Sequence, residues 1–524
     1  MLVHVSNPTT LVRLSRSLSL VHTSRALNDD PRWPGWDVVV GIEVHAQIKS
    51  RHKLFSECGQ GSLTSDYSVP PNTRVSPYDA AFPGTLPRLN PRCVELGVRT
   101  AIALNASVQR RSSFDRKHYF YADLPAGYQI TQHYAPFATD GRLTLSKEDV
   151  HVRIKQLQLE QDTGKSTFDP RNRVSEIDLN RAGTGLMEIV SEPDMRSPEE
   201  AADYVRTLQA LLRSVGSSDG NMEQGSLRCD VNVSVNRQGA PLGTRCEIKN
   251  LNSVKFMMIA IVSEVHRHID LLEQGLAVPQ ETRGFNEDRA ETYSLRSKED
   301  APDYRYMPDP NLPPLLLNEA YVTEICQSMP ELPQAARARL LALGLSRRDV
   351  DVLMDIDSGR EITFDGQRSG GALAYFDQVA QRRDPRLVVN WITHELLGQL
   401  ASRRETFSEN SISVEQMGGL IDLLHNKKIT GTSGKSLMRH ILATRTTTMP
   451  STLAQELSLL ASPADDSNLE AWCAEAIAAL PEEADAARRG NANVVNKIVG
   501  RVMKASRGTA NAQSVKAMLL KLLH

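Results

Sequence analysis

Four polar residues in strand-like segments have side chains that could do chemistry together: Glu43, His45, Glu160 and Glu188. Residues 38–48 alternate between apolar and polar, which predicts a half-buried strand with Glu43 and His45 on its polar face. Glu160 ends a second such segment, and Glu188 has apolar neighbours on both sides. An imidazole and carboxylates that converge can hold Mg²⁺ and the phosphates of a nucleotide. Taken singly, each residue is better explained as a satisfied polar group on a sheet.

A mixture of cations and aromatic rings fills residues 114–121, which read Phe-Asp-Arg-Lys-His-Tyr-Phe-Tyr. Lys117, Tyr119 and Tyr121 are candidates for contacts with a single-stranded RNA end, because rings stack on bases and cations meet phosphates. The alternative is an ordinary edge strand with a lysine that reaches solvent, and the composition favours neither interpretation.

A second basic pattern lies near the C-terminus, where Lys497, Arg501 and Lys504 are interleaved with an apolar helical stripe. Such a stripe is more often a solvated helix face than an RNA contact. The formal net charge of the chain is −2, so there is no whole-protein basic field. Any RNA contact must come from local patches or from partner subunits.

Two short segments look like phosphate-binding loops but lack a required glycine. Residues 163–166 and 433–436 contain Gly-Lys-Ser, yet the position of the first glycine holds Leu159 or Ile429. A Gly-Thr-Gly segment has Glu188 where a dinucleotide fingerprint needs its third glycine. The sequence therefore argues against both classes of nucleotide-binding motif.

The candidate residues need a sheet and helices to position them. Residues 227–236 alternate as cleanly as the first strand, and a Gly-Ala-Pro turn leads to a second strand over 244–250, which predicts an antiparallel hairpin. One helix is expected to begin after Ser197 and to end at Gly216, and another is expected over 253–274.

Prolines mark a boundary within residues 307–314, because they interrupt both helices and central strands. Beyond it the pattern is almost entirely helical. We therefore expect an α+β protein with a largely antiparallel β domain over 36–317. An all-α helical domain should follow over 318–452, and a small helical tail domain over 453–524.

The first 30 residues differ from the rest, being rich in arginine and serine and free of acids up to Asp29. This composition is typical of a mitochondrial transit peptide, and the alternative is a tail without function. No later stretch is apolar enough to span a membrane. The 6 cysteines form no C-x-x-C pair, which argues against a disulfide scaffold and a cysteine-only zinc site.

Long motifs occur in order along the chain, at residues 40–45, 114–121, 162–166, 178–181, 188–194, 223–230, 249–253, 281–283 and 303–306. Together they closely resemble the B-subunit family of glutamyl-tRNA(Gln) amidotransferases, the GatB/GatE family. The likeness spans about residues 37–310 and extends more weakly to 502–508. It implies a β cradle domain, a helical domain and a helical tail.

The resemblance also implies an activity. The cradle would bind the acylated 3′ end of Glu-tRNA(Gln) and use ATP and Mg²⁺ to phosphorylate the glutamyl γ-carboxylate. Ammonia would come from the amidase (A) subunit, with the small (C) subunit bridging the two, in the mitochondrial matrix. No membrane partner is expected.

The family's functional residues carry over to specific positions of this sequence. Its metal ligands fall on His45, Glu160 and Glu188, and Glu43 would orient His45 or line the ammonia route. The tail would contact the tRNA body through the basic stripe at 497–504. The candidates for phosphate or ATP contacts are Lys165, Arg228, Asp230 and Lys249.

Two positions depart from the family pattern. Some members carry a zinc knuckle near the position of Cys58, but residues 76–79 read Ser-Pro-Tyr-Asp where a C-x-x-C pair would stand, so no zinc is expected. Residue 161 is Gln where bacterial members often have Glu, which leaves Glu160 as the expected ligand. The alternative function is a catalytically silent tRNA-binding or assembly subunit of the same complex.

Overall fold

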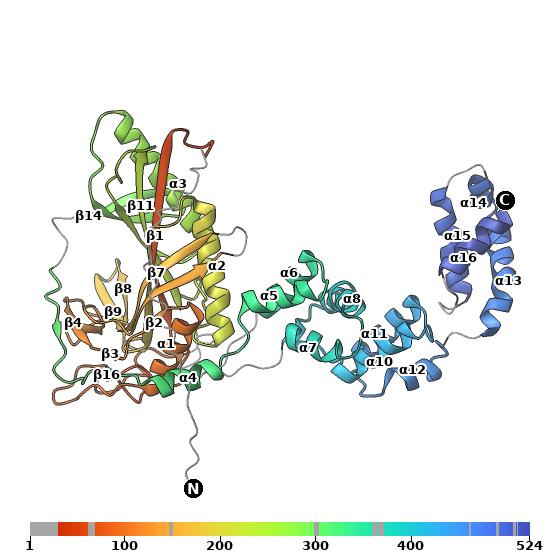
Figure 1. Cartoon of the computed structure of the whole chain (residues 1–524), viewed down its shortest axis with the longest axis horizontal. Coiled ribbons are helices and arrows are strands. Elements are labelled where there is room, and N and C mark those ends of the chain that lie inside the picture. The colour runs from red at the N-terminus through yellow and green to blue at the C-terminus, as the bar shows by residue number, and fades with distance from the viewer. Residues whose placement is uncertain are drawn as a thin grey trace, which may run out of the picture.

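The computed structural model describes residues 30–60, 69–145, 150–297, 303–358, 364, 371–460, 463–488, 492–506, 510 and 512–523. The expected leader, residues 1–30, lies almost wholly outside these ranges. The fold is α+β, as predicted: a sheet-rich body is followed by two helical bodies (Figure 1). Within the described ranges, no helix is long and apolar enough to cross a membrane.

A 9-stranded sheet organises the first body. It is antiparallel except where β12 and β13 run parallel, and β1 lies near its middle with β11 on one side and β10 on the other. In sheet order the strands are β14 (Glu291–Ser297), β13 (Glu281–Asn286), β12 (Cys246–Leu251), β11 (Leu227–Arg237), β1 (Trp36–Gln47), β10 (Gly185–Ser191), β7 (His151–Gln161), β6 (Ala138–Thr144) and β2 (Ser107–Val108).

Three long helices pack with the apolar side chains of the sheet in one hydrophobic core: α1 (Pro91–Ala103), α2 (Pro198–Val215) and α3 (Val254–Glu273). Helix α2 begins after Ser197, whose side chain accepts the backbone N–H of Glu200, and it ends at Gly216 with φ +73°. Both helices predicted in this region are present. With one face of β1 turned to this core, its polar face is left for the site.

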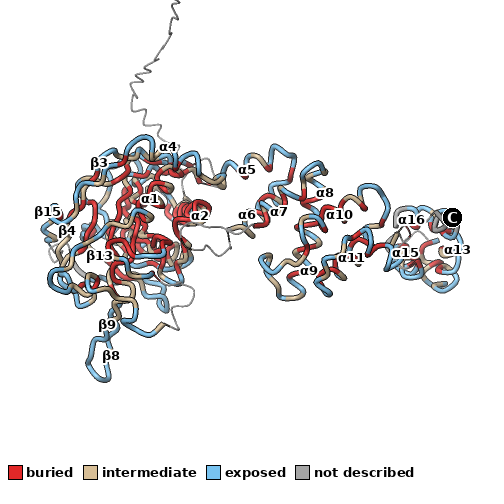
Figure 2. Tube along the Cα trace, turned by 90° about the horizontal axis from the view of Figure 1, so that it is seen from below, coloured by how far each residue is buried: buried red, intermediate tan, exposed pale blue. Residues whose placement is uncertain are grey.

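Three smaller sheets border the large one. Strand β4 (Asp115–His118) lies between β5 (Tyr128–Thr131) and β15 (Met307–Pro308), and β3 (Arg111–Ser112) pairs with β16 (Leu315–Leu316). Thus the proline-rich run returns to the first body as edge strands, the place where a sheet tolerates proline. The hairpin of β8 (Lys165–Asp169) and β9 (Val174–Asp178) projects from the body and is exposed along most of its length (Figure 2).

The remaining helices form two further hydrophobic cores, apart from α4, whose Ile325 packs in the first core. The second core begins at Leu340 and the third at Leu469. The helices are α4 (Glu319–Gln327), α5 (Pro333–Ala342), α6 (Arg347–Ser358), α7 (Ala372–Val379), α8 (Pro385–Asn390), the π-helix η3 (Trp391–Leu396), α9 (Leu397–Ser402), the 3₁₀ turn η4 (Phe407–Glu409), α10 (Val414–His425), α11 (Gly431–Thr444), α12 (Pro450–Glu456), α13 (Pro463–Ala479), α14 (Pro481–Arg488), α15 (Ala492–Ala505) and α16 (Ala512–Leu523).

Candidate metal and catalytic site

Three neighbouring strands bring His45, Glu160 and Glu188 to one place on the polar face of the large sheet. His45 on β1 lies directly opposite Glu188 on β10, and the next strand, β7, carries Glu160. One ligand atom from each residue lies within 4.8 Å of the others. The shared face follows from the two-residue period of a strand, whereas the convergence follows from the strand order. These three residues are called the triad below.

The two carboxylates of the triad lie close together, with Glu160 buried and Glu188 half-buried. Glu160 is 2% exposed and accepts a hydrogen bond from Thr131 Oγ1 at 3.2 Å, and Gln158 Nε2 donates to Glu188. Burial, reinforced by the charge of Glu160, holds the pKa of Glu188 well above its ordinary value. Burial also opposes ionisation of Glu160, but the charge of Lys117 helps to keep the pKa of Glu160 below its ordinary value.

This donor set fits a divalent cation. Carboxylate oxygens with an imidazole can hold Mg²⁺, and a cation between the two neighbouring carboxylates would relieve their repulsion. Two other cations of this face are already paired: Arg228 lies 2.9 Å from an oxygen of Asp162, and Lys249 lies 2.8 Å from an oxygen of Asp230. The ion pairs of Arg228 and Lys249 are thus made with Asp162 and Asp230 rather than with the carboxylates of the triad.

Glu43 lies one step along the same face of β1 from His45. Its Oε1 accepts a hydrogen bond from Asn232 Nδ2 at 3.2 Å, and its charge contributes to the raised pKa of Glu188. The group of possible ligands contains the triad without Glu43. Glu43 thus lies at the edge of the site, where its negative charge affects the protonation of Glu188.

Asp230 lies on β11 opposite Glu43, and its carboxylate lies close to both Lys249 and His45. Its Oδ2 accepts a hydrogen bond from Lys249 Nζ at 2.8 Å and lies 4.0 Å from His45 Nε2. The backbone N–H of Asn250 donates to its other oxygen. A carboxylate held in this way suits the orientation of Lys249 and of the His45 ring better than direct contact with a phosphate.

The sequence interpretation missed Asp162, which holds several neighbours in place. It is 2% exposed, and its carboxylate accepts from Gln47 Nε2 at 3.0 Å and from Arg228 at 2.9 Å, with Arg181 at 3.5 Å. Burial opposes its ionisation, yet Arg228 and Arg181 lower the pKa of Asp162 below its ordinary value. The signal was available, since Asp162 stands two residues after Glu160 and two-residue spacing places side chains on one strand face.

Lys165, another candidate for a phosphate contact, lies in the separate β8–β9 sheet rather than in the large sheet that carries the triad. It is exposed at the start of β8, opposite Asp178, at the base of the projecting hairpin. Arg228, by contrast, lies directly opposite His45 on β11.

The candidates for contacts with a single-stranded RNA end differ in their surroundings and in their exposure to solvent. Lys117 lies near the triad, because its charge helps to keep the pKa of Glu160 below its ordinary value. Its Nζ is also 5.0 Å from the ring centroid of Tyr304. Tyr119 donates a hydrogen bond to Gln129 at 3.1 Å and is half-buried, whereas Tyr121 is 62% exposed.

Residues 38–323 match the family described as the GatB/GatE catalytic domain, and residues 374–523 match the GatB domain. The chain belongs to the GatB/GatE family. The triad and Asp162 lie within the segment that matches the catalytic domain.

Several relatives align with nearly the whole length of this chain. The mitochondrial B subunit of the glutamyl-tRNA(Gln) amidotransferase from Laccaria bicolor is 56% identical, over 99% of this chain and 97% of the relative. The protein of the same name from Cryptococcus neoformans is 44% identical, over 99% and 98%. The B subunit of the aspartyl/glutamyl-tRNA(Asn/Gln) amidotransferase from Rickettsia bellii is 43% identical, over 93% and 98%.

The basic stripe of the tail lies on α15, in the body most distant from the sheet (Figure 1). Lys497, Arg501 and Lys504 are all exposed, and Lys497 Nζ lies 2.6 Å from Glu483. This stripe lies in the second segment that matches the GatB/GatE family, apart from the catalytic domain. Any contact that it makes with RNA is therefore separate from the triad.

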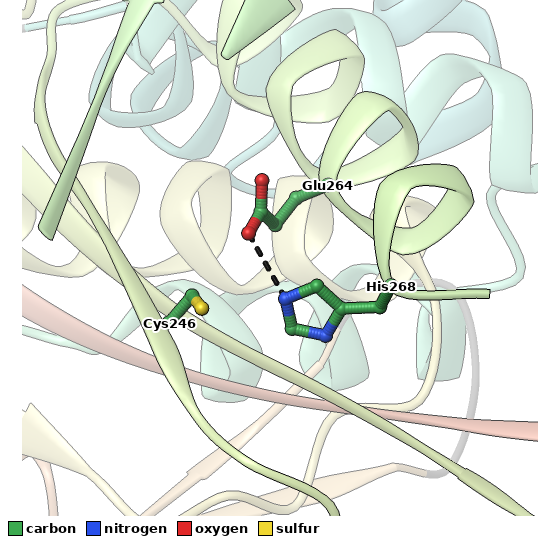
Figure 3. A group of neighbouring side chains, drawn as sticks. All are labelled: Cys246, Glu264 and His268. Carbon is green, nitrogen blue, oxygen red and sulfur yellow. Dashed lines mark hydrogen bonds and ion pairs between the residues drawn. The ribbon is translucent and has the colours of Figure 1, made fainter. Parts of the chain in front are cut away.

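A second group of potential ligands, Cys246, Glu264 and His268, lies between β12 and α3 (Figure 3). Glu264 is fully buried but already neutralised, because Arg267 lies 2.6 Å and Arg283 3.1 Å from its oxygens. His268 Nε2 is 2.9 Å from the same carboxylate. A cation here would meet two guanidinium groups, so this cluster suits a structural link from α3 to the β13–β14 hairpin better than a metal.

The segment around Cys58, where no zinc is expected, is held by a buried ion pair. Lys53 Nζ lies 3.1 Å from Asp79 and donates to the backbone oxygen of Arg74 at 2.8 Å. Ser56 and the backbone N–H of Ser76 also donate to the Asp79 carboxylate. The pair links the segment around Cys58 to residues 74–79, and the expectation of no zinc stays a prediction.

Proposed function

We propose that this chain is the glutamate-activating subunit of a tRNA-dependent amidotransferase, a carbon–nitrogen ligase that converts Glu-tRNA(Gln) to Gln-tRNA(Gln). The observation that carries the proposal is the convergence of His45, Glu160 and Glu188 within 4.8 Å. Family membership and the names of the relatives support the same role. The names of the relatives from Laccaria bicolor and Cryptococcus neoformans include the word mitochondrial, which supports action in mitochondrial translation, and we place the complex in the matrix.

The reaction takes place in two steps, because a carboxylate is a poor acyl donor. A γ-carboxylate oxygen of the tRNA-bound glutamate attacks the γ-phosphorus of ATP, and the bond to ADP breaks. Ammonia then attacks the acyl phosphate carbon, phosphate leaves with the bridging oxygen, and a proton is lost. The first step depends on charge neutralisation and alignment more than on covalent catalysis by the protein.

Different residues on the polar face of the large sheet would contribute to these two steps. His45, Glu160 and Glu188 would hold Mg²⁺, which supplies charge neutralisation at the phosphates when it is bound. Glu43 adjoins them on the side of β11 and is proposed to position the site or to line the route of ammonia.

The proposed phosphate contacts come from the cations around the triad. Arg228 is held by Asp162 and Lys249 by Asp230, so both guanidinium and ammonium groups are positioned before a nucleotide arrives. Lys165, at the base of the hairpin, would reach the site only from its edge, and it is the weakest of these candidates.

The complex would be a heterotrimer. The amidase (A) subunit would hydrolyse glutamine and deliver ammonia, and the small (C) subunit would bridge the two larger chains. This chain lacks the Ser-Ser-Lys amidase signature, so we expect the isolated chain to release no ammonia from glutamine. Steady glutaminase activity of the purified single chain would contradict this division of labour.

The test supplies the assembled complex with Glu-tRNA(Gln), ATP, Mg²⁺ and ammonium chloride, and identifies the amino acid recovered from the tRNA. Ammonium bypasses the amidase, so the assay isolates the step assigned to this chain. Glutamine that forms only with ATP, and that is lost in His45→Ala, would support the proposal. Tight binding of tRNA without glutamine would instead identify a silent assembly subunit.

A further inference from the structure

Asp162 is shared by two arginines that come from different segments of the chain. Arg228 on β11 lies 2.9 Å from one carboxylate oxygen, and Arg181, in the segment between β9 and β10, lies 3.5 Å from the other. Two guanidinium charges and one buried carboxylate charge leave these three residues with a net charge of +1. They are called the arginine cluster below.

Arg228 reaches Asp162 through one nitrogen and keeps other donors in reserve. Its Nη2 donates to Asp162 Oδ1 at 2.9 Å, and among the described residues its buried Nε has no hydrogen-bond partner. A buried N–H without an acceptor is uncommon in a folded protein and calls for an explanation. Because Arg228 lies directly opposite His45, a phosphate bound at the triad would supply an acceptor for this group.

The backbone of Asp162 is fixed without either arginine. Its N–H donates to the Thr184 oxygen at 2.8 Å, and its own backbone oxygen accepts from the Gly183 N–H at 2.9 Å. Gln47 Nε2 also donates to the Asp162 carboxylate, at 3.0 Å. The position of Asp162 therefore depends little on Arg181, whereas the charge around Asp162 depends on Arg181 directly.

Arg181 is tied to the backbone next to Asp162. Its Nε donates to the Thr163 oxygen at 3.0 Å, and its Nη2 donates to the Gly164 oxygen at 2.6 Å. These bonds hold its guanidinium group at the base of the β8–β9 hairpin. Of the two arginines, Arg228 is thus the one able to turn toward an anion, while Arg181 remains with the carboxylate.

We propose that Arg181 offsets the charge of Asp162, so that Arg228 keeps its own positive charge for a phosphate oxygen of ATP at the triad. This inference rests on the proposed function and deepens it, because it adds a residue that acts on the nucleotide through Arg228. Without Arg181, Asp162 and Arg228 would form a neutral pair, and a phosphate would compete with the carboxylate for the guanidinium group. Arg181 is a positioning residue, since its own donors face the backbone of Thr163 and Gly164.

The test measures ATP affinity by equilibrium dialysis and amidation with ammonium chloride, both in the assembled complex. Arg181→Gln keeps hydrogen-bond donors but loses the charge. It should lower ATP affinity and kcat/KM for ATP by about 10–100-fold, the size expected when a hydrogen bond to a charged group is lost. Arg181→Lys should lose only about threefold, because it keeps the charge but not the fork of donors. The KM for Glu-tRNA(Gln) should stay the same in both variants.

A double-mutant cycle shows whether Arg181 acts through Arg228. Arg228→Ala should itself weaken ATP binding, and Arg181→Gln added to it should cause little further loss, because the group on which it acts is absent. Losses that multiply in the double variant would overturn the inference, and so would normal ATP affinity in either single variant. Equal losses in Arg181→Lys and Arg181→Gln would also overturn it, because the charge would then not matter.

Arg196→Gln is the matched control. Like Arg181, Arg196 donates to two main-chain oxygens, those of Pro193 at 2.7 Å and Met195 at 3.0 Å, but it lies beyond the opposite end of β10. This change should leave ATP affinity and amidation unaltered. A loss equal to that of Arg181→Gln would show a general effect of removing a positive charge and would overturn the inference.

The two proposals can fail separately. If the unaltered complex forms Gln-tRNA but Arg181→Gln binds ATP normally, the role of Arg181 fails and the proposed function stands. If no Gln-tRNA forms while ATP affinity depends on the charge of Arg181, the proposed function fails and the arginine cluster stands as an anion site.

Discussion

Glu188→Gln should make the metal-free protein more stable while it removes the activity. The triad places ligand atoms of Glu160, which is buried, and Glu188, which is half-buried, within 4.8 Å of each other. Two full charges at that separation repel by about 3 kcal/mol at an effective dielectric constant of about 20. The raised pKa of Glu188 lets the protein avoid part of this repulsion by binding a proton, so about 3 kcal/mol is the upper limit of the gain.

The same shift fixes the direction of the pH dependence. Because the folded protein holds the Glu188 proton above the unfolded pKa of 4.5, it binds more protons than the unfolded chain there. The stability of the metal-free protein should therefore fall as pH rises from that value through the folded pKa. Glu188→Gln should lack this component of the decline.

The assay combines three measurements. Thermal melting in EDTA should show a higher midpoint for Glu188→Gln, by about 2–4 °C for each kcal/mol gained. Titration with Mg²⁺ should show at least about a hundredfold weaker binding, since even groups that only orient a metal ligand affect affinity by 10–100-fold. ATP-dependent amidation should be lost, while tRNA binding persists.

Glu192→Gln is the matched control, because it removes a carboxylate just after the end of β10 without altering the triad. It should leave melting, Mg²⁺ affinity and amidation unchanged. Turnover of Glu188→Gln that equals the unaltered rate at saturating Mg²⁺ would refute the ligand assignment. A lower melting midpoint in EDTA would refute the repulsion between the two carboxylates.

Three further changes test other parts of the structure. Asp162→Asn should free Arg228 and lower the amidation rate with little change in Mg²⁺ affinity, and equal effects on both would contradict a positioning role. Glu264→Gln should destabilise the first body by up to about 3–5 kcal/mol in urea unfolding, because the half-buried Arg267 and the buried Arg283 lose a buried carboxylate partner and keep only Glu281. Since partners hold the pKa of Glu264 far below 4.5, stability from this network should be lost as pH falls below that value. Lys53→Met should leave Asp79 buried without its cation and lower the melting midpoint, while elemental analysis of the unaltered protein should find no zinc.

The local pattern of the sequence predicted much of the fold. Alternation in β1 placed Glu43 and His45 on one face, because side chains of a strand point to opposite sides in turn. Ser197 and Gly216 set the ends of α2 through hydrogen bonding at its start and a left-handed backbone at its end. Both signals act over a few residues, so a single sequence carries them completely.

The site itself depends on contacts between distant segments. Motif resemblance named His45, Glu160 and Glu188, yet no local pattern states that β1 lies between β10 and β11 with β7 beyond. Pairing of strands so far apart in the chain is settled by the burial of one whole sheet face, which is a property of the folded body.

The sequence by itself determined which residue types are present, which face of β1 and β11 each side chain occupies, and where α2 and α3 begin and end. Only the tertiary structure decided that Asp162 holds Arg228, that Lys117 lies near the carboxylates of the triad, and that Tyr304 and Tyr306 join the rings around β4. The physical reason is that a charge or a ring acts on whatever lies within a few ångströms of it. Chain folding, rather than spacing along the sequence, sets those neighbours.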